Sequence, residues 1–363
     1  MRILLITRGK FLRHPELFFK TEYNGVKTNP VVAGGFGWFW EKALKSMGHE
    51  VTTFMYFQNP SLDHSSRLEE FTLTLKNKIS LLKKAVINST NSKFVSLCQA
   101  YKPELILMDA GEYILPESLN KVKLRTKTKI VNWLLDDPFR QDWKNIIDSA
   151  AIYDCIFVFD PFYIERLKGN KGICVKYLAC ACDPDIHRTY QLEETEISRL
   201  KSGLCFIGSL TQSRIRLLTE LDDFDLGIWT YWKKAIKQSP LLYKNYRGIA
   251  WGEDASKILN CCQIALNFHH EQSVYGLNMK TFEIAGCGAF QLVDNKRELG
   301  NIFELGKEMI CYENIKQLKD LIEYFLKNQK ESREIAERAQ AKVIREHTYK
   351  HRLSKLIETV KSL

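Results

Sequence analysis

The chain has 363 residues, of which 45% are hydrophobic and 26% are charged, and its formal net charge is +10. This composition is typical of a globular protein, and the length predicts two domains. No run approaches the roughly 18 apolar residues of a membrane-spanning helix, and ten cysteines without a signal segment indicate a cytoplasmic protein with free thiols.

The basic surplus lies in the first half of the chain. Residues 1–180 contain 26 Lys and Arg against 18 Asp and Glu, whereas the remainder contains 27 against 25. Such a surplus can face an anionic membrane, an acidic acceptor or nucleic acid, or it can serve solubility alone. Because no nucleic-acid-binding motif accompanies it, we expect no nucleic-acid partner.

Apolar runs alternate with helical segments through the first half. We expect a helix at 36–47 and strands at 2–7, 50–56, 104–108, 129–134, 155–159 and 173–177. Near-continuous apolar strands separated by helices predict a parallel, doubly wound sheet.

Residues 66–101 are expected to form two helical segments. The first, 67–87, has four lysines beside an apolar stripe. Two interpretations stay open, a helix lying on a membrane surface and a packed helix with solvated lysines.

The composition changes at residues 181–202, which we interpret as a linker. A second alternation follows, with strands expected at 204–207, 226–229, 247–250, 264–268, 290–293 and 308–311 and helices from 315 onward. The pattern predicts a Rossmann-like domain at 1–180 and another at 203–347. Ligands of such sheets bind at the carboxyl ends of the strands.

Glycines lie just before and within the first turn of the first expected helix. Gly34, Gly35 and Gly37 suggest a substrate-side loop that lets a ligand approach the start of the helix. A dinucleotide fingerprint is disfavoured, because Trp40 stands at the third glycine position and the first strand ends near residue 7.

Asp136 and Asp137 follow an expected strand and precede Pro138. Two acids at a strand end can orient sugar hydroxyls or act as a catalytic base. They can equally cap the turn that begins before the proline.

Two further clusters follow strands of the second half. Gly208, Ser209 and Arg214 form a plausible phosphate cradle, although any α/β unit has such a turn. His269 precedes another histidine and a glutamate. We expect no metal site there, because adjacent side chains on an extended segment point in opposite directions; contact of His269 with a ligand is the better interpretation.

The segment 278–289 suits a nucleoside diphosphate. Lys280 can meet phosphate charge beside a helix N-terminus, and Glu283 can accept two ribose hydroxyl protons. The alternative is an ordinary amphipathic helix with a glycine stop. No Gly-x-Ser-x-Gly elbow or Walker loop is present, which disfavours hydrolases and nucleoside triphosphatases.

Together these segments resemble glycosyltransferases of the GT-B architecture, and most closely the CgeB-like spore maturation family. The matching segments are 133–138, 153–160, 177–184, 206–209 with Arg214, 266–269, 278–312 and 347–352.

The resemblance implies metal-independent transfer of a sugar from a nucleotide-activated donor, with no cofactor besides that co-substrate. It implies that Glu283 holds the donor ribose, that Lys280 and Arg214 meet the diphosphate, and that Gly208 and Ser209 line it. It also implies that the terminal helix, 348–363, crosses back to the first domain.

His269, Tyr275 and Asn278 complete the expected donor site. Tyr275 departs from the pattern, because many retaining GT-B enzymes have a glutamate eight residues before the ribose-binding one.

The expected acceptor is a glycan, a lipid-linked molecule or a protein. The basic first domain suggests peripheral contact with the inner face of a membrane. Two alternatives stay open, a non-catalytic nucleotide-sugar-binding or coat-assembly module and a nucleotide-sugar epimerase of the same fold.

Overall fold

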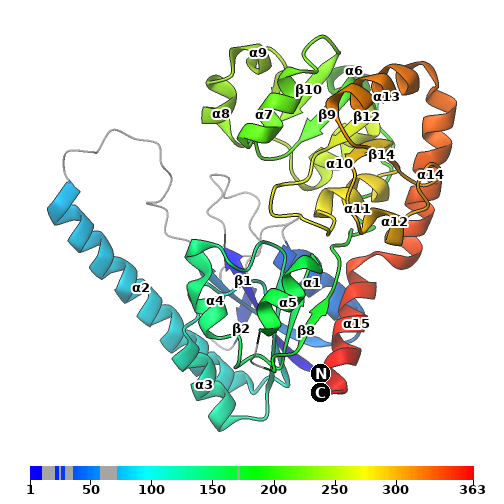
Figure 1. Ribbon diagram of the computed structural model, residues 1–363. Coiled ribbons are helices and arrows are strands. Elements are labelled where there is room, and N and C mark those ends of the chain that lie inside the picture. Colours follow the sequence, from blue (N-terminus) through cyan, green and yellow to red (C-terminus); the bar gives the residue numbers. More distant parts are fainter. Residues whose placement is uncertain (10–20, 24–25, 29–35, 58–71, 170–171) are drawn as a thin grey trace. The chain divides into compact units, whose positions relative to one another are not determined.

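The computed structural model describes residues 1–9, 21–23, 26–28, 36–57, 72–169 and 172–363 (Figure 1). The chain divides into two compact units. Unit 1 comprises Met1–Val158, Tyr163–Leu178 and Leu353–Leu363, and unit 2 comprises Phe159–Phe162 and Ala179–Arg352.

Unit 1 is built on a six-stranded sheet in which all neighbours are parallel. In spatial order its strands are β4 (Glu50–Phe57), β1 (Arg2–Gly9), β5 (Leu105–Met108), β6 (Lys129–Leu134), β7 (Cys155–Val158) and β8 (Val175–Tyr177). The four consecutive side chains from Ile3 to Ile6 are all fully buried. Because successive side chains point to opposite faces, both faces of this sheet are covered.

The helices of unit 1 come between these strands. They are α1 (Phe36–Ser46), α2 (Thr72–Tyr101), α3 (Pro116–Arg125), α4 (Lys144–Asp148) and α5 (Phe162–Lys168), with a 3₁₀ turn at Gln141–Trp143. A short antiparallel pair of strands, β2 (Thr21–Tyr23) and β3 (Val26–Thr28), is also present.

The expectation of two helical segments at 66–101 is wrong for the described residues, where α2 is one helix of 30 residues. No glycine or proline interrupts it. In its polar middle, the side chain of Asn91 is hydrogen-bonded to the backbone of the segment before α3. That amide donates to the carbonyl of Tyr113 and accepts the N–H of Leu115, each at 2.8 Å. Of the apolar stripe, Val86 is the one member with a described side chain, and it is 49% exposed.

Unit 2 repeats the architecture with a second six-stranded sheet of parallel neighbours. In spatial order its strands are β11 (Tyr246–Gly248), β10 (Leu226–Trp229), β9 (Ser202–Ile207), β12 (Cys262–Asn267), β13 (Gln291–Asp294) and β14 (Ile310–Tyr312). Each main strand of both sheets lies within two residues of its expected bounds, so the prediction of parallel, doubly wound sheets is confirmed.

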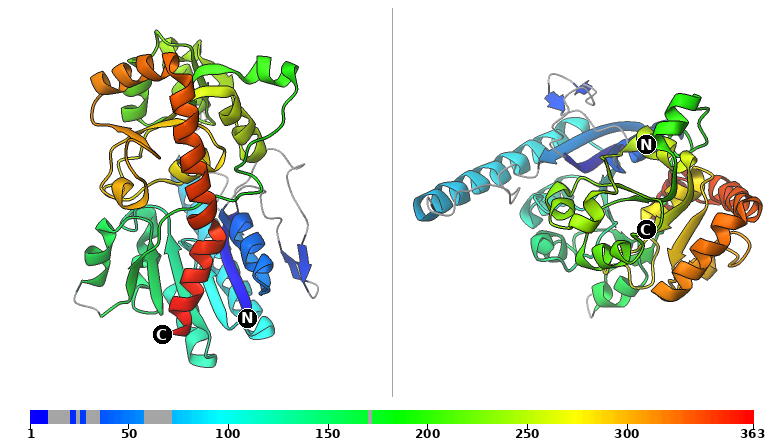
Figure 2. Two further views of the ribbon diagram at one scale, coloured as in Figure 1. Left: turned by 90° about the vertical axis from the view of Figure 1, so that its right-hand side faces the viewer. Right: turned by 90° about the horizontal axis from the view of Figure 1, so that it is seen from above.

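The helices of unit 2 surround this sheet, and α14 packs along α11 (Figure 2). They are α6 (Glu194–Leu200), α7 (Gln212–Thr219), α8 (Lys233–Lys237), α9 (Pro240–Tyr243), α10 (Gly252–Cys261), α11 (Met279–Gly286), α12 (Leu299–Ile302), α13 (Ile315–Lys327) and α14 (Gln329–Glu346).

The last helix, α15 (Tyr349–Lys361), belongs to both units. It begins in unit 2, whereas the residues from Leu353 to the end belong to unit 1. The expected crossing of the terminal helix is therefore confirmed. No helix among the described residues has the length and apolar character needed to cross a membrane.

Candidate functional site

Both sheets have a topological switch point, where successive strands are added on opposite sides of a central pair. In unit 1 the pair is β1 and β5, and in unit 2 it is β9 and β12. Ligands of open α/β sheets bind outside the carboxyl ends of strands at such points. The polar side chains gathered at these two edges are therefore the candidates for function.

Arg214 spans the switch point of unit 2. Its Nη1 donates to the carbonyl and hydroxyl oxygens of Ser209, at 3.1 and 2.7 Å, and its Nη2 donates to the carbonyl oxygen of Phe268 at 2.5 Å. Thr211 caps helix α7 and accepts the N–H of Arg214. The guanidinium thus joins the turn after β9, which includes Gly208, to the segment after β12. Two of its nitrogens are already committed to the protein.

His269 is fixed by a carboxylate that the sequence did not single out. Its backbone N–H and its ring Nδ1 both lie close to Asp294 Oδ1, at 2.7 and 2.8 Å. Since the carboxylate accepts, Nδ1 has a ring proton, and the buried Nε2 has no hydrogen-bond partner among the described residues. Asp294 ends β13, so its position at a strand end was the available signal.

Asn278 is the N-cap of helix α11. Its Oδ1 accepts the N–H of Thr281 at 2.9 Å, and its Nδ2 donates to Oδ1 of Asn267 at 2.8 Å. Asn267 in turn donates to the Thr281 hydroxyl and to Gln291. This amide network attaches the start of α11 to the end of β12. It therefore brings α11 to the strand from which His269 follows.

Glu283 is buried between two basic side chains. Lys280 Nζ lies 2.6 Å from Glu283 Oε2, and His187 Nε2 lies 3.8 Å from Glu283 Oε1. His187 Nδ1 accepts the N–H of Asp183 at 2.9 Å, so the proton on Nε2 faces the carboxylate. Burial favours the protonated acid, but Lys280 and His187 together lower the pKa of Glu283. The carboxylate is therefore charged and held from both sides.

His187 lies within the stretch that the sequence suggested as a linker, and it is packed against α11. A Cβ added to Gly286 would lie 3.1 Å from Cβ of His187 and 3.2 Å from Sγ of Cys182. The absence of a side chain at Gly286 thus lets the two segments touch. Sequence reasoning missed His187 because its partner is far away along the chain.

Tyr275 lies in a loop that a buried aspartate secures. Asp160 is fully buried, and its Oδ2 accepts the N–H groups of Val274 and Tyr275 at 2.7 and 3.0 Å. The Tyr275 ring meets Phe162 edge-on at 5.5 Å, and the Arg297 guanidinium lies 5.3 Å from its centre. At the position of the expected glutamate there is therefore an aromatic ring already engaged on two sides.

The structure corrects the assignment of Gly37 to a substrate-side loop. Gly34 and Gly35 lie outside the described residues, but Gly37 belongs to helix α1 and not to a loop before it. A Cβ at this position would lie 2.6 Å from the Thr7 side chain. The glycine therefore serves the close approach of α1 to β1.

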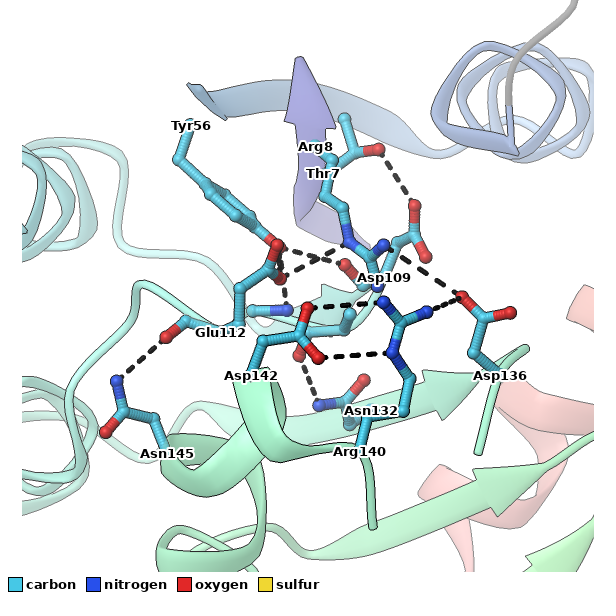
Figure 3. A network of polar contacts seen from close by, with 12 residues as sticks. Thr7, Arg8, Tyr56, Asp109, Glu112, Asn132, Asp136, Arg140, Asp142 and Asn145 are labelled. Atoms are coloured by element: carbon cyan, nitrogen blue, oxygen red, sulfur yellow. Dashed lines mark hydrogen bonds and ion pairs between the residues drawn. The ribbon is translucent and has the colours of Figure 1, made fainter. Parts of the chain in front are cut away.

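Asp136 and Asp137 belong to unit 1 and have different surroundings. Asp137 Oδ1 accepts the N–H of Phe139 at 2.9 Å, the contact of a turn cap. Asp136 Oδ2 lies 3.5 Å from Nη1 of Arg140 and 4.0 Å from Nη1 of Arg8. Asp136 is thereby joined to the polar network at the carboxyl edge (Figure 3).

That network extends inward from Arg8 (Figure 3). Arg8 Nε lies 3.3 Å from Glu112 Oε2, whose carboxylate also accepts the hydroxyl proton of Tyr56 at 2.7 Å. Thr7 donates to Asp109 Oδ2 at 3.2 Å and so joins β1 to the end of β5 across the switch point. Burial is the main reason that the pKa of Asp109 is raised to about 6, and Glu112 adds to it.

Part of the chain is similar to a known protein family. Residues 211–358 match the family model described as glycosyl transferase-like. None of the curated proteins compared with the chain matches it.

Solved structures resemble the whole chain. Sucrose-phosphate synthase from Thermosynechococcus elongatus matches with a TM-score of 0.65 at 10% identity, over 99% of each chain. A glycosyltransferase from Rickettsia africae gives 0.63 at 12%, over 99% of this chain and 98% of that one. HepE from Anabaena, solved with UDP and glucose, gives 0.63 at 12% over 100% of each chain.

At these identities the likeness concerns the fold. With two parallel six-stranded sheets, it shows a two-domain α/β fold of the GT-B type, as the resemblance had implied. The family match over 211–358 supports a glycosyltransferase.

Proposed function

We propose that the protein is a metal-independent glycosyltransferase that moves a sugar from a nucleotide-activated donor to an acceptor. The observation that carries the proposal is the Lys280–Glu283 pair on α11, at the carboxyl edge of unit 2 and within the segment that matches the glycosyltransferase-like family. We further propose that the chain falls within the CgeB-like group of these enzymes.

The chemistry requires stabilisation of a leaving nucleoside diphosphate. Lys280 supplies a cation beside the N-terminus of α11, and both attract phosphate charge. Glu283 supplies a fixed carboxylate for the ribose hydroxyls. In this assignment Arg214 shapes the turn of Gly208 and Ser209 around the phosphates, because its own N–H groups hold that turn. No cofactor besides the nucleotide sugar is proposed.

The proposal also covers the class of donor and of acceptor. HepE was solved with UDP and glucose, which makes a UDP-sugar the first donor to try. A glycan, a lipid-linked molecule or a protein is proposed as acceptor, with the basic first half of the chain on the acceptor side. We propose a cytoplasmic location at the inner face of a membrane and no nucleic-acid partner.

Donor binding is tested by thermal unfolding with a panel of nucleoside diphosphates and nucleotide sugars. A ligand at one hundred times its dissociation constant adds about 2.7 kcal/mol of stability. We expect a selective shift with one nucleotide, and then release of that nucleoside diphosphate in the presence of an acceptor and of a metal chelator. Absence of any shift across the panel would overturn the proposal.

A non-catalytic nucleotide-sugar-binding module is the second candidate, and Tyr275 favours it. The position that holds a donor-contacting glutamate in many retaining relatives of the fold has an aromatic ring packed on Phe162. Selective donor binding without turnover, across glycan, lipid-linked and protein acceptors, would favour the module over the enzyme.

A further inference from the structure

Two thiols of unit 1 lie in direct contact. Cys155 is the first residue of β7, and Cys174 immediately precedes β8. Their Sγ atoms are 2.8 Å apart. The two strands are parallel neighbours, and the N–H of Ile156 donates to the carbonyl oxygen of Cys174 at 2.8 Å. The sheet therefore holds the two cysteines side by side, as a disulfide between them requires.

The two thiols differ in their access to solvent. Cys155 is completely buried, whereas Cys174 is half-buried. Burial is the main reason that the pKa of the Cys155 thiol is raised, and Cys174 adds to it. Because the thiolate is the reactive form of a cysteine, Cys155 is a poor first target for a dissolved oxidant. An oxidant therefore meets Cys174 first.

We propose that Cys155 and Cys174 form a reversible disulfide when the protein meets hydrogen peroxide. The Cys174 thiolate attacks one peroxide oxygen and becomes a sulfenic acid, and the other oxygen leaves as hydroxide. The Cys155 sulfur then attacks the Cys174 sulfur and displaces its hydroxyl group. The protons of the two thiols end on the two departing hydroxyl groups, so one disulfide and two water molecules are formed. A dithiol reductant restores both thiols by exchange.

The disulfide joins the two ends of the crossover from β7 through α5 to β8. The cysteines are 19 residues apart, and closing a loop of this length restricts the unfolded chain and so stabilises the folded one. β8 is an edge strand whose sheet neighbour is β7. Oxidation should therefore raise the midpoint of thermal unfolding and slow hydrogen exchange at the N–H of Ile156.

The test treats the full chain with hydrogen peroxide. After removal of the peroxide, titration of the denatured chain should find two fewer thiols than the ten of the reduced chain. Peptide mapping without reductant should place Cys155 and Cys174 in one cross-linked product. The midpoint of thermal unfolding should rise after oxidation and return to its original value with dithiothreitol.

Three variants separate the two roles. Cys174→Ser removes the accessible thiol, and we expect neither the cross-link nor the rise in the unfolding midpoint. Cys155→Ala leaves Cys174 without a partner, so its sulfenic acid should accumulate and be trapped by dimedone. Cys311→Ser is the matched control, because it removes a half-buried thiol from β14 of unit 2 and should form the cross-link as the parent does.

Three results would overturn the proposal. They are ten thiols remaining after peroxide, a cross-link between other cysteines, and oxidation of Cys174 to a sulfinic acid without an S–S bond. A cross-link that dithiothreitol does not remove would contradict its reversibility. The parent and Cys174→Ser decide the question even if the buried substitution Cys155→Ala prevents folding. The proposed donor residues belong to unit 2 and no nucleotide enters the measurement, so failure here leaves the proposed function untouched.

Discussion

Lys280 Nζ lies 2.6 Å from Glu283 Oε2, and the two residues are one turn apart on α11. Glu283 is only 4% exposed, so its charge depends on this neighbour. An ammonium group has three donors and can meet a phosphate while it keeps the carboxylate. The pair therefore links the phosphate-binding part of the proposed donor site to its ribose-binding part. A diphosphate bound at Lys280 would act directly on the carboxylate that would hold the ribose.

Lys280→Met should destabilise the protein and weaken nucleotide binding together. The variant leaves a buried carboxylate with one cation fewer, which costs about 3 kcal/mol. Adding Glu283→Gln removes the buried charge and should restore most of the stability but not the affinity. Chemical denaturation and calorimetry on the parent, the two single variants and the double variant measure both effects.

Lys257→Met is the matched control for that cycle. Lys257 pairs with Glu196 at 3.4 Å, but both side chains are about one-third exposed. Loss of such a surface pair costs below about 1 kcal/mol. Equal destabilisation by the two methionine substitutions would contradict the argument from burial.

His187→Leu should weaken the binding of nucleotides but not of pyrophosphate. His187 acts through Glu283, whose Oε1 it faces at 3.8 Å, and so its loss affects the ribose contact alone. His187→Gln, which keeps a polar N–H donor, should recover part of the affinity. A parallel loss of pyrophosphate binding would show that His187 merely supports the packing of α11.

The strands and the polar residues gathered on α11 could be predicted from the sequence because their signals are local. Apolar runs locate the sheets, and Asn278, Lys280 and Glu283 lie within one short segment. Contacts between distant segments have no such signal. Asp160 meets the N–H of Val274 across 114 residues, and nothing near either residue indicates it.

The same limit explains the errors in unit 1. Gly37 was assigned to a loop because Gly34 and Gly35 come shortly before it, whereas it lies in helix α1, where an added Cβ would lie 2.6 Å from the Thr7 side chain of β1. Two helical segments were expected at 66–101, whereas Asn91 lies within the single helix α2 and is satisfied by Tyr113 and Leu115. In each case a tertiary partner overrides the local preference.

His347 should make unit 2 sensitive to acid. Burial, and then Arg352, lower the pKa of His347 from 6.5 to about 4, and Arg352 Nη2 lies 2.6 Å from its Nδ1. As the pH falls from 6.5 to 4, the unfolded chain binds this proton before the folded chain does, so stability is lost across that window. The shift corresponds to about 3 kcal/mol.

His347→Gln tests this assignment, because the amide oxygen still accepts from Arg352. The free energy of unfolding of the variant, relative to the parent, should rise by about 3 kcal/mol between pH 7 and pH 4. His351→Gln, at a more solvated histidine of α15, should show a smaller change. A constant difference between parent and variant over the whole range would mean that His347 is protonated in the folded chain as readily as in the unfolded one.

Asp109 should produce the opposite dependence in unit 1. Its pKa is raised from 3.8 to about 6, so between these values the unfolded chain has lost a proton that the folded chain keeps, and stability falls as the pH rises. In Asp109→Asn this loss disappears. The variant should gain about 3 kcal/mol relative to the parent between pH 3.8 and pH 6.

The comparison is made by denaturation of parent and variant in the same buffers, with Asp142→Asn as a control whose side chain is 54% exposed. Parallel curves for Asp109→Asn and the parent would show that Asp109 ionises normally despite Thr7, Arg8 and Glu112 around it. The predicted change has the opposite sign to that of His347→Gln. Unfolding of the whole chain by acid would change the stability of both variants, relative to the parent, in the same direction. Opposite pH dependences of these two stability differences therefore show that His347 and Asp109 each titrate as their own surroundings require.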